Sequence, residues 1–153
     1  MSNALFDCAL RALALRDHSE TELRRKLSAK RFGAEEIEAA LSRLRELSYL
    51  DDRRFARTFA ESAMRNGRGF GAKLSQDLSR RGITPATIAE VLEELSGEFD
   101  ERESLAELLE RKFPRFEAAT ATEKEKRRVV GYLQRRGFTL SAIFSALKGA
   151  ASD

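Results

Sequence analysis

The chain has 153 residues, of which 42% are hydrophobic and 35% charged, and 28 Lys and Arg against 25 Asp and Glu give a net charge of +3. This composition excludes a disordered chain, and no apolar run approaches the roughly 18 residues that a membrane helix needs. The single cysteine, Cys8, and the single histidine, His18, exclude an internal disulfide and argue against a metal site or a Cys–His catalytic pair. The N-terminus lacks the basic start of a secretory signal, so we expect a soluble cytoplasmic protein.

The first predicted helix covers residues 4–16, with Leu10 and Leu13 on one face. Ser19 and Glu22 have the spacing of a capping box and predict the start of a second helix. A third helix follows the turn at residues 30–33. This group of three helices accounts for the first 50 residues.

The same order of signals returns twice along the chain. The leading helix is predicted at 51–65, where Asp51 or Asp52 supplies the start signal, and again at 100–112, where Asp100 and Glu103 have capping-box spacing. No segment alternates for long enough to predict a strand. The other helix-start signals are Thr84 with Pro85, and Thr122 with Glu125.

An internal repeat underlies this order. From a starting residue, apolar side chains recur at +4, +9, +14 and +18, and they do so at all positions of three copies. The sequence therefore predicts an all-α fold of three tandem three-helix repeats, at 1–50, 51–98 and 99–153, stacked as an elongated, curved array. The repeat positions are Leu23, Leu27, Phe32, Ile37 and Leu41; Leu74, Leu78, Ile83, Ile88 and Leu92; and Val129, Leu133, Phe138, Ile143 and Leu147.

Glycine marks the turn between the last two helices in two of the three repeats. Gly82 and Gly137 can take the left-handed conformation that ends a helix, and the next apolar residue then packs back. In the first repeat the order is Phe32 then Gly33, so glycine stands at the helix cap. We expect this first turn to differ in detail from the other two.

The small net charge hides strongly charged segments. Residues 53–82 carry eight basic and two acidic groups, residues 83–110 nine acidic groups and one arginine, and residues 111–148 ten basic and three acidic groups. Such blocks serve either to keep helices soluble or to present separate positive and negative faces to partners.

Basic residues also recur at one repeat position, at Lys30, Arg81 and Arg136. They either offset the helix dipole or form a repeated edge that follows a phosphate backbone or an acidic protein surface. A sequence-reading helix-turn-helix is disfavoured, because the following helices in the first two repeats are acidic. The glycine cluster at 66–71 lacks the Lys-Ser/Thr end of a P-loop, so we interpret it as a flexible, basic connecting loop. We expect Cys8 to be a packing residue and His18 to have no catalytic role.

Four segments together resemble the bacterial RecX family. They are Arg16–Leu27 (RDHSETELRRKL), Tyr49–Arg57 (YLDDRRFAR), Leu78–Ile83 (LSRRGI) and Leu133–Phe138 (LQRRGF). The resemblance extends over essentially the whole chain and rests on the order and spacing of these motifs. It implies tandem three-helix repeats, in agreement with the repeat above.

The resemblance also implies a modulator of the RecA recombinase, one that binds the RecA–single-stranded DNA filament and inhibits its ATPase, strand exchange and co-protease activities. It implies no catalytic residue, cofactor or metal, and we expect a monomer that is not an enzyme. A stand-alone nucleic-acid-binding protein, on single- or double-stranded DNA, and a purely structural scaffold are the alternatives. The candidate residues for binding RecA or DNA are Arg24, Arg25, Lys26, Lys30, Arg31, Arg65, Arg68, Lys73, Arg80, Arg81, Lys124, Lys126, Arg127, Arg128, Arg135 and Arg136.

Overall fold

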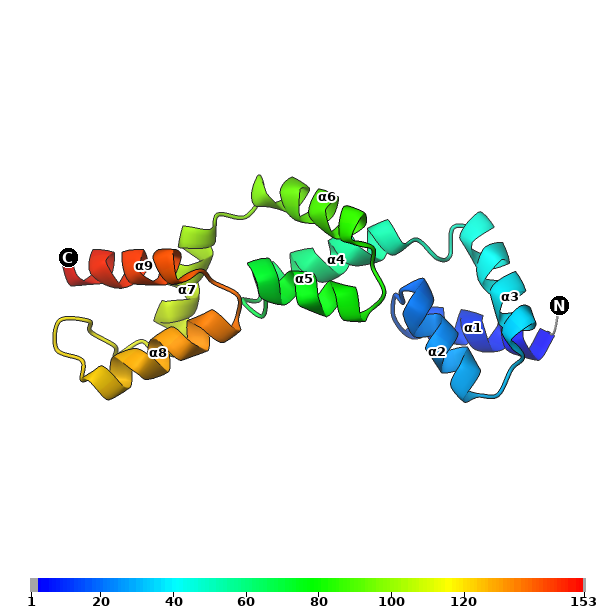
Figure 1. Cartoon of the computed structure of the whole chain (residues 1–153), viewed down its shortest axis with the longest axis horizontal. Helices are drawn as coiled ribbons and strands as arrows, with labels where there is room; N and C mark the ends of the chain where they lie inside the picture. The colour runs from blue at the N-terminus through cyan, green and yellow to red at the C-terminus, as the bar shows by residue number, and fades with distance from the viewer. Residues whose placement is uncertain (1–2, 153) are drawn as a thin grey trace. The chain divides into compact units, whose positions relative to one another are not determined.

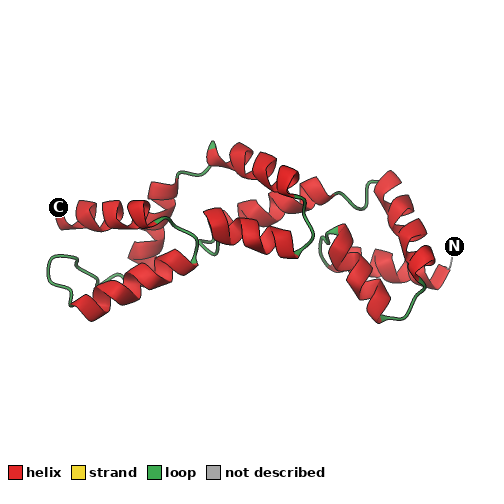
Figure 2. Cartoon of the chain, viewed as in Figure 1, coloured by secondary structure: helices red, strands yellow, loops and turns green. Residues whose placement is uncertain are grey.

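A computed structural model describes residues 3–152, and over this range the chain consists of nine α-helices and connecting loops, with no strand (Figures 1 and 2). The predicted all-α class is therefore confirmed. The helices are α1 (Asn3–Leu15), α2 (Glu20–Ala29), α3 (Ala34–Glu46), α4 (Asp52–Arg65), α5 (Gly71–Arg80), α6 (Pro85–Ser96), α7 (Glu101–Lys112), α8 (Glu123–Arg135) and α9 (Leu140–Ser152).

Contacts between residues divide the described chain into two compact units. Unit 1 holds the described residues up to Thr58 together with Leu78–Val91, and unit 2 holds Phe59–Asp77 and the described residues from Leu92 onward. Helices α4, α5 and α6 contribute residues to both units. The division therefore runs through the middle group of three helices.

The core of unit 1 is formed where α1, α2 and α3 pack on one another. Helix α1 contributes Leu5, Ala9 and Ala12, which are all buried. Leu10 and Leu13, which have the predicted helical spacing, are partly buried and pack against this core. Apolar residues surround most of α1, so a spacing of three to four residues does not select a single face.

In unit 2, α9 packs against both α7 and α8. Leu105 and Leu108 of α7 are buried, together with the five repeat positions of the third repeat and with residues of α4, α5 and α6 such as Met64, Leu74 and Leu95. Thirteen of the fifteen repeat positions are buried in the chain as a whole, and Phe32 and Leu92 are partly buried. The repeat is thus a pattern of core residues.

Most of the predicted helix starts are capped as expected. Ser19 and Glu22 form a complete capping box at α2, and Thr122 accepts a hydrogen bond from the backbone N–H of Glu125 at α8. Thr84 accepts one from Thr87 N–H at 3.3 Å. At α7 the expected box does not form, because the Asp100 carboxylate accepts from the N–H of Arg102, one residue earlier.

The turns after α2, α5 and α8 share one backbone conformation. Arg31, Gly82 and Gly137 stand at the equivalent position with φ of 67°, 83° and 100°. In each turn the following apolar residue donates its N–H to the carbonyl of the second repeat leucine, as Phe32 does to Leu27 at 3.4 Å. The first turn shares this conformation and differs in detail, as expected, because Gly33 is the N-cap residue of α3 and supplies no side-chain cap. A non-glycine residue takes the left-handed conformation there.

Candidate functional site

The described residues include no group of three or more His, Cys, Asp or Glu side chains placed to hold a metal ion. No described helix has the length and apolar character that spanning a bilayer requires. Cys8 is partly buried against the core of unit 1. His18 is 3% exposed, its Nδ1 lies 2.9 Å from the Arg16 carbonyl oxygen, and burial lowers its pKa by disfavouring the charged ring. These side chains serve packing within the described chain.

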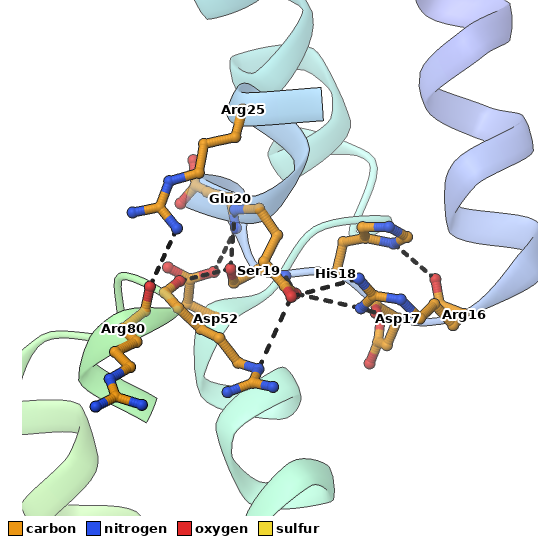
Figure 3. A network of polar contacts seen from close by, with 10 residues as sticks. Arg16, Asp17, His18, Ser19, Glu20, Arg25, Asp52 and Arg80 are labelled. Atoms are coloured by element: carbon orange, nitrogen blue, oxygen red, sulfur yellow. Dashed lines mark hydrogen bonds and ion pairs between the residues drawn. The ribbon is translucent and has the colours of Figure 1, made fainter. Parts of the chain in front are cut away.

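In unit 1, the start of α2 is joined to the end of α5 by a hydrogen bond from the buried Ser19 side chain (Figure 3). Ser19 is fully buried, and its hydroxyl donates to the Arg81 carbonyl oxygen at 2.6 Å while accepting from Glu22 N–H at 3.1 Å. Arg25 adds a hydrogen bond from its guanidinium to the Arg80 carbonyl oxygen at 3.2 Å. Ser19 therefore both caps its own helix and binds the turn of the next repeat. We call this contact between the start of α2 and the turn after α5 the first junction.

The start of α4 also contacts the start of α2, through Asp52 (Figure 3). The Asp52 carboxylate accepts the backbone N–H of Glu20 at 2.9 Å, so it caps α2 rather than its own helix, which Asp51 caps through Arg54 N–H. Burial raises the pKa of Asp52, against the opposing effect of that hydrogen bond. The start of α2 is thus held by a side chain from the next repeat as well as by its own.

Glu22 completes this polar cluster. Burial alone would raise the pKa of Glu22, but hydrogen bonds from Arg16 and from Ser19 N–H hold it below the ordinary value. Its carboxylate also lies 3.8 Å from the Arg81 guanidinium. The carboxylate therefore stays ionised and fixes cations on two sides of the junction.

Unit 2 contains an equivalent junction, made by backbone atoms. Phe70 occupies the repeat position of Ser19, and its N–H donates to the Arg136 carbonyl oxygen at 2.8 Å. Arg136 in turn occupies the repeat position of Arg81. The Phe70 and Phe138 rings stack with centroids 4.4 Å apart, which adds an apolar contact to the hydrogen bond.

Close approach at these two junctions explains the glycines. A Cβ on Gly82 would lie 2.0 Å from Thr21 Oγ1, and one on Gly137 would lie 1.9 Å from the Phe70 carbonyl oxygen. Both positions also have positive φ. Arg31 stands at the same repeat position but is exposed, which is consistent with a turn that carries a side chain there. Glycine is needed where the turn docks, not for the turn alone.

The glycine cluster between α4 and α5 is more ordered than the sequence suggested. Gly67, Gly69 and Phe70 are all buried, and a Cβ on Gly67 would lie 3.1 Å from the side chains of Leu108 and Arg111. The Arg111 guanidinium donates to the Asn66 carbonyl oxygen at 3.1 Å. The expectation of a flexible connecting loop was therefore wrong, since the loop is a packed part of unit 2.

Several predicted binding cations have a partner within the chain. Arg24 is paired with Glu38 at 2.6 Å, Arg65 with Glu61 at 2.7 Å and Lys73 with Asp77 at 2.8 Å. Lys126 lies 3.6 Å from Glu123, and Arg127 donates to the Glu123 carbonyl oxygen. Arg68 contacts the Ser62 hydroxyl, and Arg136 lies over the Tyr132 ring at 4.9 Å. Ion pairs of this exposed kind contribute about 1 kcal/mol or less to stability.

The other predicted cations extend into solvent. In unit 1 these are Lys26, Lys30, Arg31 and Arg80, and in unit 2 they are Lys124, Arg128 and Arg135. The repeated basic position, at Lys30, Arg81 and Arg136, serves the junctions through the carbonyl groups of its last two members.

Three family models match the chain in succession. They are the first three-helix domain of RecX at residues 6–44, the second at 51–92 and the third at 100–147. The chain belongs to the RecX family. The "Regulatory protein RecX" of Trichlorobacter lovleyi is 44% identical over 140 residues, covering 90% of this chain and 91% of the relative. That of Syntrophotalea carbinolica is 40% identical over 136 residues, covering 89% of each chain.

A solved RecX structure shows the same fold. The crystal structure of RecX from Lactobacillus salivarius matches with a TM-score of 0.79 at 18% identity, over 98% of this chain and 96% of that one. The three RecX domains correspond to α1–α3, α4–α6 and α7–α9. Both junctions therefore join consecutive RecX domains.

Sequence reasoning missed the side chains that form these junctions. Ser19 and Asp52 both have helix-capping signals, and their second partners lie in the next repeat. The available signal was the contrast between Gly82 and Gly137 on one side and Arg31 on the other. A glycine present only in repeats that have a predecessor indicates a docking position.

Proposed function

We propose that this RecX-family protein is a non-catalytic, monomeric, cytoplasmic regulator that binds the RecA–single-stranded DNA filament and inhibits RecA ATPase, strand exchange and co-protease activity. The observation that supports the proposal most strongly is the succession of three RecX domains over residues 6–147 of this chain. The relatives that it matches are named as regulatory proteins. The link to RecA comes from the family resemblance. Such an activity would dampen recombination, DNA repair and the SOS response.

Electrostatics favour binding to a nucleoprotein surface. The exposed cations lie in both compact units, and each repeat would be one contact module, at 1–50, 51–98 and 99–153. Lysines and arginines that displace counterions from phosphates supply most of the sequence-independent affinity for nucleic acid. The acidic segment 83–110 would meet basic RecA surface. Cations that extend into solvent need give up no ion pair on binding, so we rank Lys26, Lys30, Arg31 and Arg80 above their paired neighbours.

A titration of RecA ATPase activity tests the proposal. RecA from the same organism, saturated with single-stranded DNA and ATP, should hydrolyse ATP more slowly as the protein is added, with an effect below one protein per RecA. Replacing Arg80 together with Lys30 by Ala should shift the titration to higher concentration. Arg11, exposed on α1 and outside the candidate set, provides the control variant Arg11→Ala. Unchanged hydrolysis at stoichiometric protein would contradict inhibition as the function.

The alternative is a nucleic-acid-binding protein that acts without RecA. The basic segments 53–82 and 111–148 favour some affinity of this kind. Titrating labelled single- and double-stranded DNA in the absence of RecA distinguishes the two functions. Tight binding to DNA alone, combined with no change in RecA activity, would favour the alternative.

A further inference from the structure

A basic pocket lies in the third RecX domain, inside unit 2. It has a volume of about 230 Å³ and is lined by Lys112 and Phe113 at the end of α7 and by Arg128, Tyr132 and Arg135 of α8. The three residues of α8 are spaced i, i+4 and i+7, so they share one helical face. Lys112, Arg128 and Arg135 are exposed, and no carboxylate lines the pocket.

Tyr132 is the unusual member of this group. Its ring is held on edge against Phe113, with centroids 5.2 Å apart at 85°, and the Arg136 guanidinium lies 4.9 Å from its centroid. The hydroxyl is shielded from solvent and has no hydrogen-bond partner among the described residues. A buried hydroxyl without a partner is unfavourable, so such groups in proteins usually have one, supplied by water or a ligand if not by the chain.

The internal repeat shows what has changed at this position. Lys73, Asp77 and Arg80 of the second domain stand at the repeat positions of Arg128, Tyr132 and Arg135. In the second domain the Asp77 carboxylate pairs with Lys73 at 2.8 Å. Tyr132 replaces that carboxylate with a hydroxyl, so the third domain keeps the two cations and has no carboxylate at the position of Asp77.

The charged groups around the pocket are mostly positive. An adjoining pocket shares Lys112, Phe113 and Arg128 and adds one further cation, Arg115, and one carboxylate, Glu125. The C-terminal end of α7 carries the negative end of a helix dipole, which opposes an anion, but Lys112 sits in its last turn. The cations outnumber these opposing charges.

We propose that this pocket binds a phosphate group, with Arg128, Arg135 and Lys112 as its charged ligands, and that a shift of the Tyr132 ring on binding brings its hydroxyl, which is shielded in the free protein, to the phosphate as an uncharged donor. Phosphate oxygens accept hydrogen bonds from several directions, as donors from two helices would supply, and arginine is well suited to bind them. The pocket would hold either a phosphodiester of single-stranded DNA or a free phosphate. In the first case the inference deepens the proposed function and rests on it, since a filament contains such phosphates.

Tyrosine fluorescence gives a direct test, because the chain has only two tyrosines, Tyr49 and Tyr132, and no tryptophan. In a Tyr49→Phe variant, inorganic phosphate added at constant ionic strength should change the Tyr132 emission saturably. In a Tyr132→Phe variant, Tyr49 reports collisional quenching alone, which is linear in phosphate. A linear response in both variants would overturn the proposal.

Binding of a labelled oligothymidylate, measured by anisotropy without RecA, identifies the source of the phosphate. Tyr132→Phe and Arg128→Ala should each weaken binding by roughly tenfold if the ligand is a phosphodiester, because each loses a hydrogen bond to a charged group. Arg102→Ala, an exposed charge-matched control on α7, should weaken it by less than about twofold. A saturable phosphate response with unchanged oligothymidylate affinity would support the pocket and assign it to free phosphate.

Thermal unfolding separates this role from a structural one. Tyr132→Phe removes a hydroxyl that has no partner in the described part of the chain, so it should unfold at the same temperature as the wild type or slightly higher. A lower unfolding temperature would show that the hydroxyl serves the fold and would overturn the proposal. RecA is absent from every one of these measurements, so the pocket and the regulation of RecA can fail independently.

Discussion

Replacing Gly137 by Ala should strongly destabilise unit 2. The new Cβ would lie 1.9 Å from the Phe70 carbonyl oxygen and 2.7 Å from its carbonyl carbon. Both are backbone atoms, so no change of rotamer can relieve the overlap. The turn must move away from Phe70, or the φ of 100° at this residue must change.

The size of the effect can be built from the contacts that would be lost. Holding a non-glycine residue at this φ costs about 1–3 kcal/mol. Separating the turn from Phe70 removes the hydrogen bond from Phe70 N–H to Arg136, about 1 kcal/mol, and weakens the Phe70–Phe138 stack by a similar amount. We therefore expect Gly137→Ala to lower the free energy of unfolding by about 3–5 kcal/mol.

Urea unfolding followed by circular dichroism measures this difference. Gly97→Ala is the matched control in the same unit, since its Cβ would meet only the Glu94 carbonyl oxygen at an ordinary 3.6 Å, and we expect a change within about 1 kcal/mol. If Gly137→Ala were as stable as Gly97→Ala, the docking of the turn on Phe70 would not be a stabilising contact. The explanation of the glycines would then fail.

Three further predictions concern the first junction. Ser19→Ala should lower the free energy of unfolding by about 2–3 kcal/mol, because it removes both a helix cap and the hydrogen bond to the Arg81 carbonyl oxygen. Thr122→Ala removes only a cap and should cost about 1 kcal/mol. Equal losses by urea unfolding would contradict the second role of Ser19. Arg31 and Gly82 occupy the same repeat position but should respond differently to alanine. Arg31→Ala should change the free energy of unfolding by less than about 0.5 kcal/mol, and Gly82→Ala should lower it by more than about 2 kcal/mol. Similar urea midpoints for the two variants would refute the docking argument. Burial lowers the folded-state pKa of His18, so the unfolded chain takes up a proton first and stability is lost as pH falls below about 6.5. Between about pH 7.5 and about pH 5.5, the urea midpoint should fall in the wild type and fall less in His18→Gln. The lowered pKa of Glu22 affects stability only at more acidic pH. An identical dependence of the midpoint on pH in both proteins would remove His18 as the cause.

The amino-acid pattern predicts those parts of this fold that depend on local chemistry and periodicity. Apolar spacing located the buried faces of α2, α5, α8 and their partner helices, because core burial and helical period act together. On α1, where apolar residues occur all around the helix, it located Leu10 and Leu13, which pack against the core but are only partly buried. Capping signals located most helix starts, and only Asp100 bonds one residue away from the expected donor.

The candidate site was less predictable, since it depends on contacts between residues far apart in the sequence. The capping residues Ser19 and Asp52 each have a partner in another repeat, and a sequence motif records only the local role. Pairing of Arg24 with Glu38 similarly joins two helices across a turn. Tyr132 has no motif around it, and its buried hydroxyl becomes apparent only when Phe113 and Arg136 are placed around the ring.

Co-sedimentation with RecA filaments tests the proposed function most directly. RecA assembled on long single-stranded DNA with a non-hydrolysable ATP analogue is pelleted in the presence of increasing protein, so that binding is measured separately from ATP hydrolysis. We predict saturable recovery of the protein in the pellet with RecA filaments, well above that with DNA alone. A protein that stays in the supernatant with filaments of its cognate RecA would contradict the proposal.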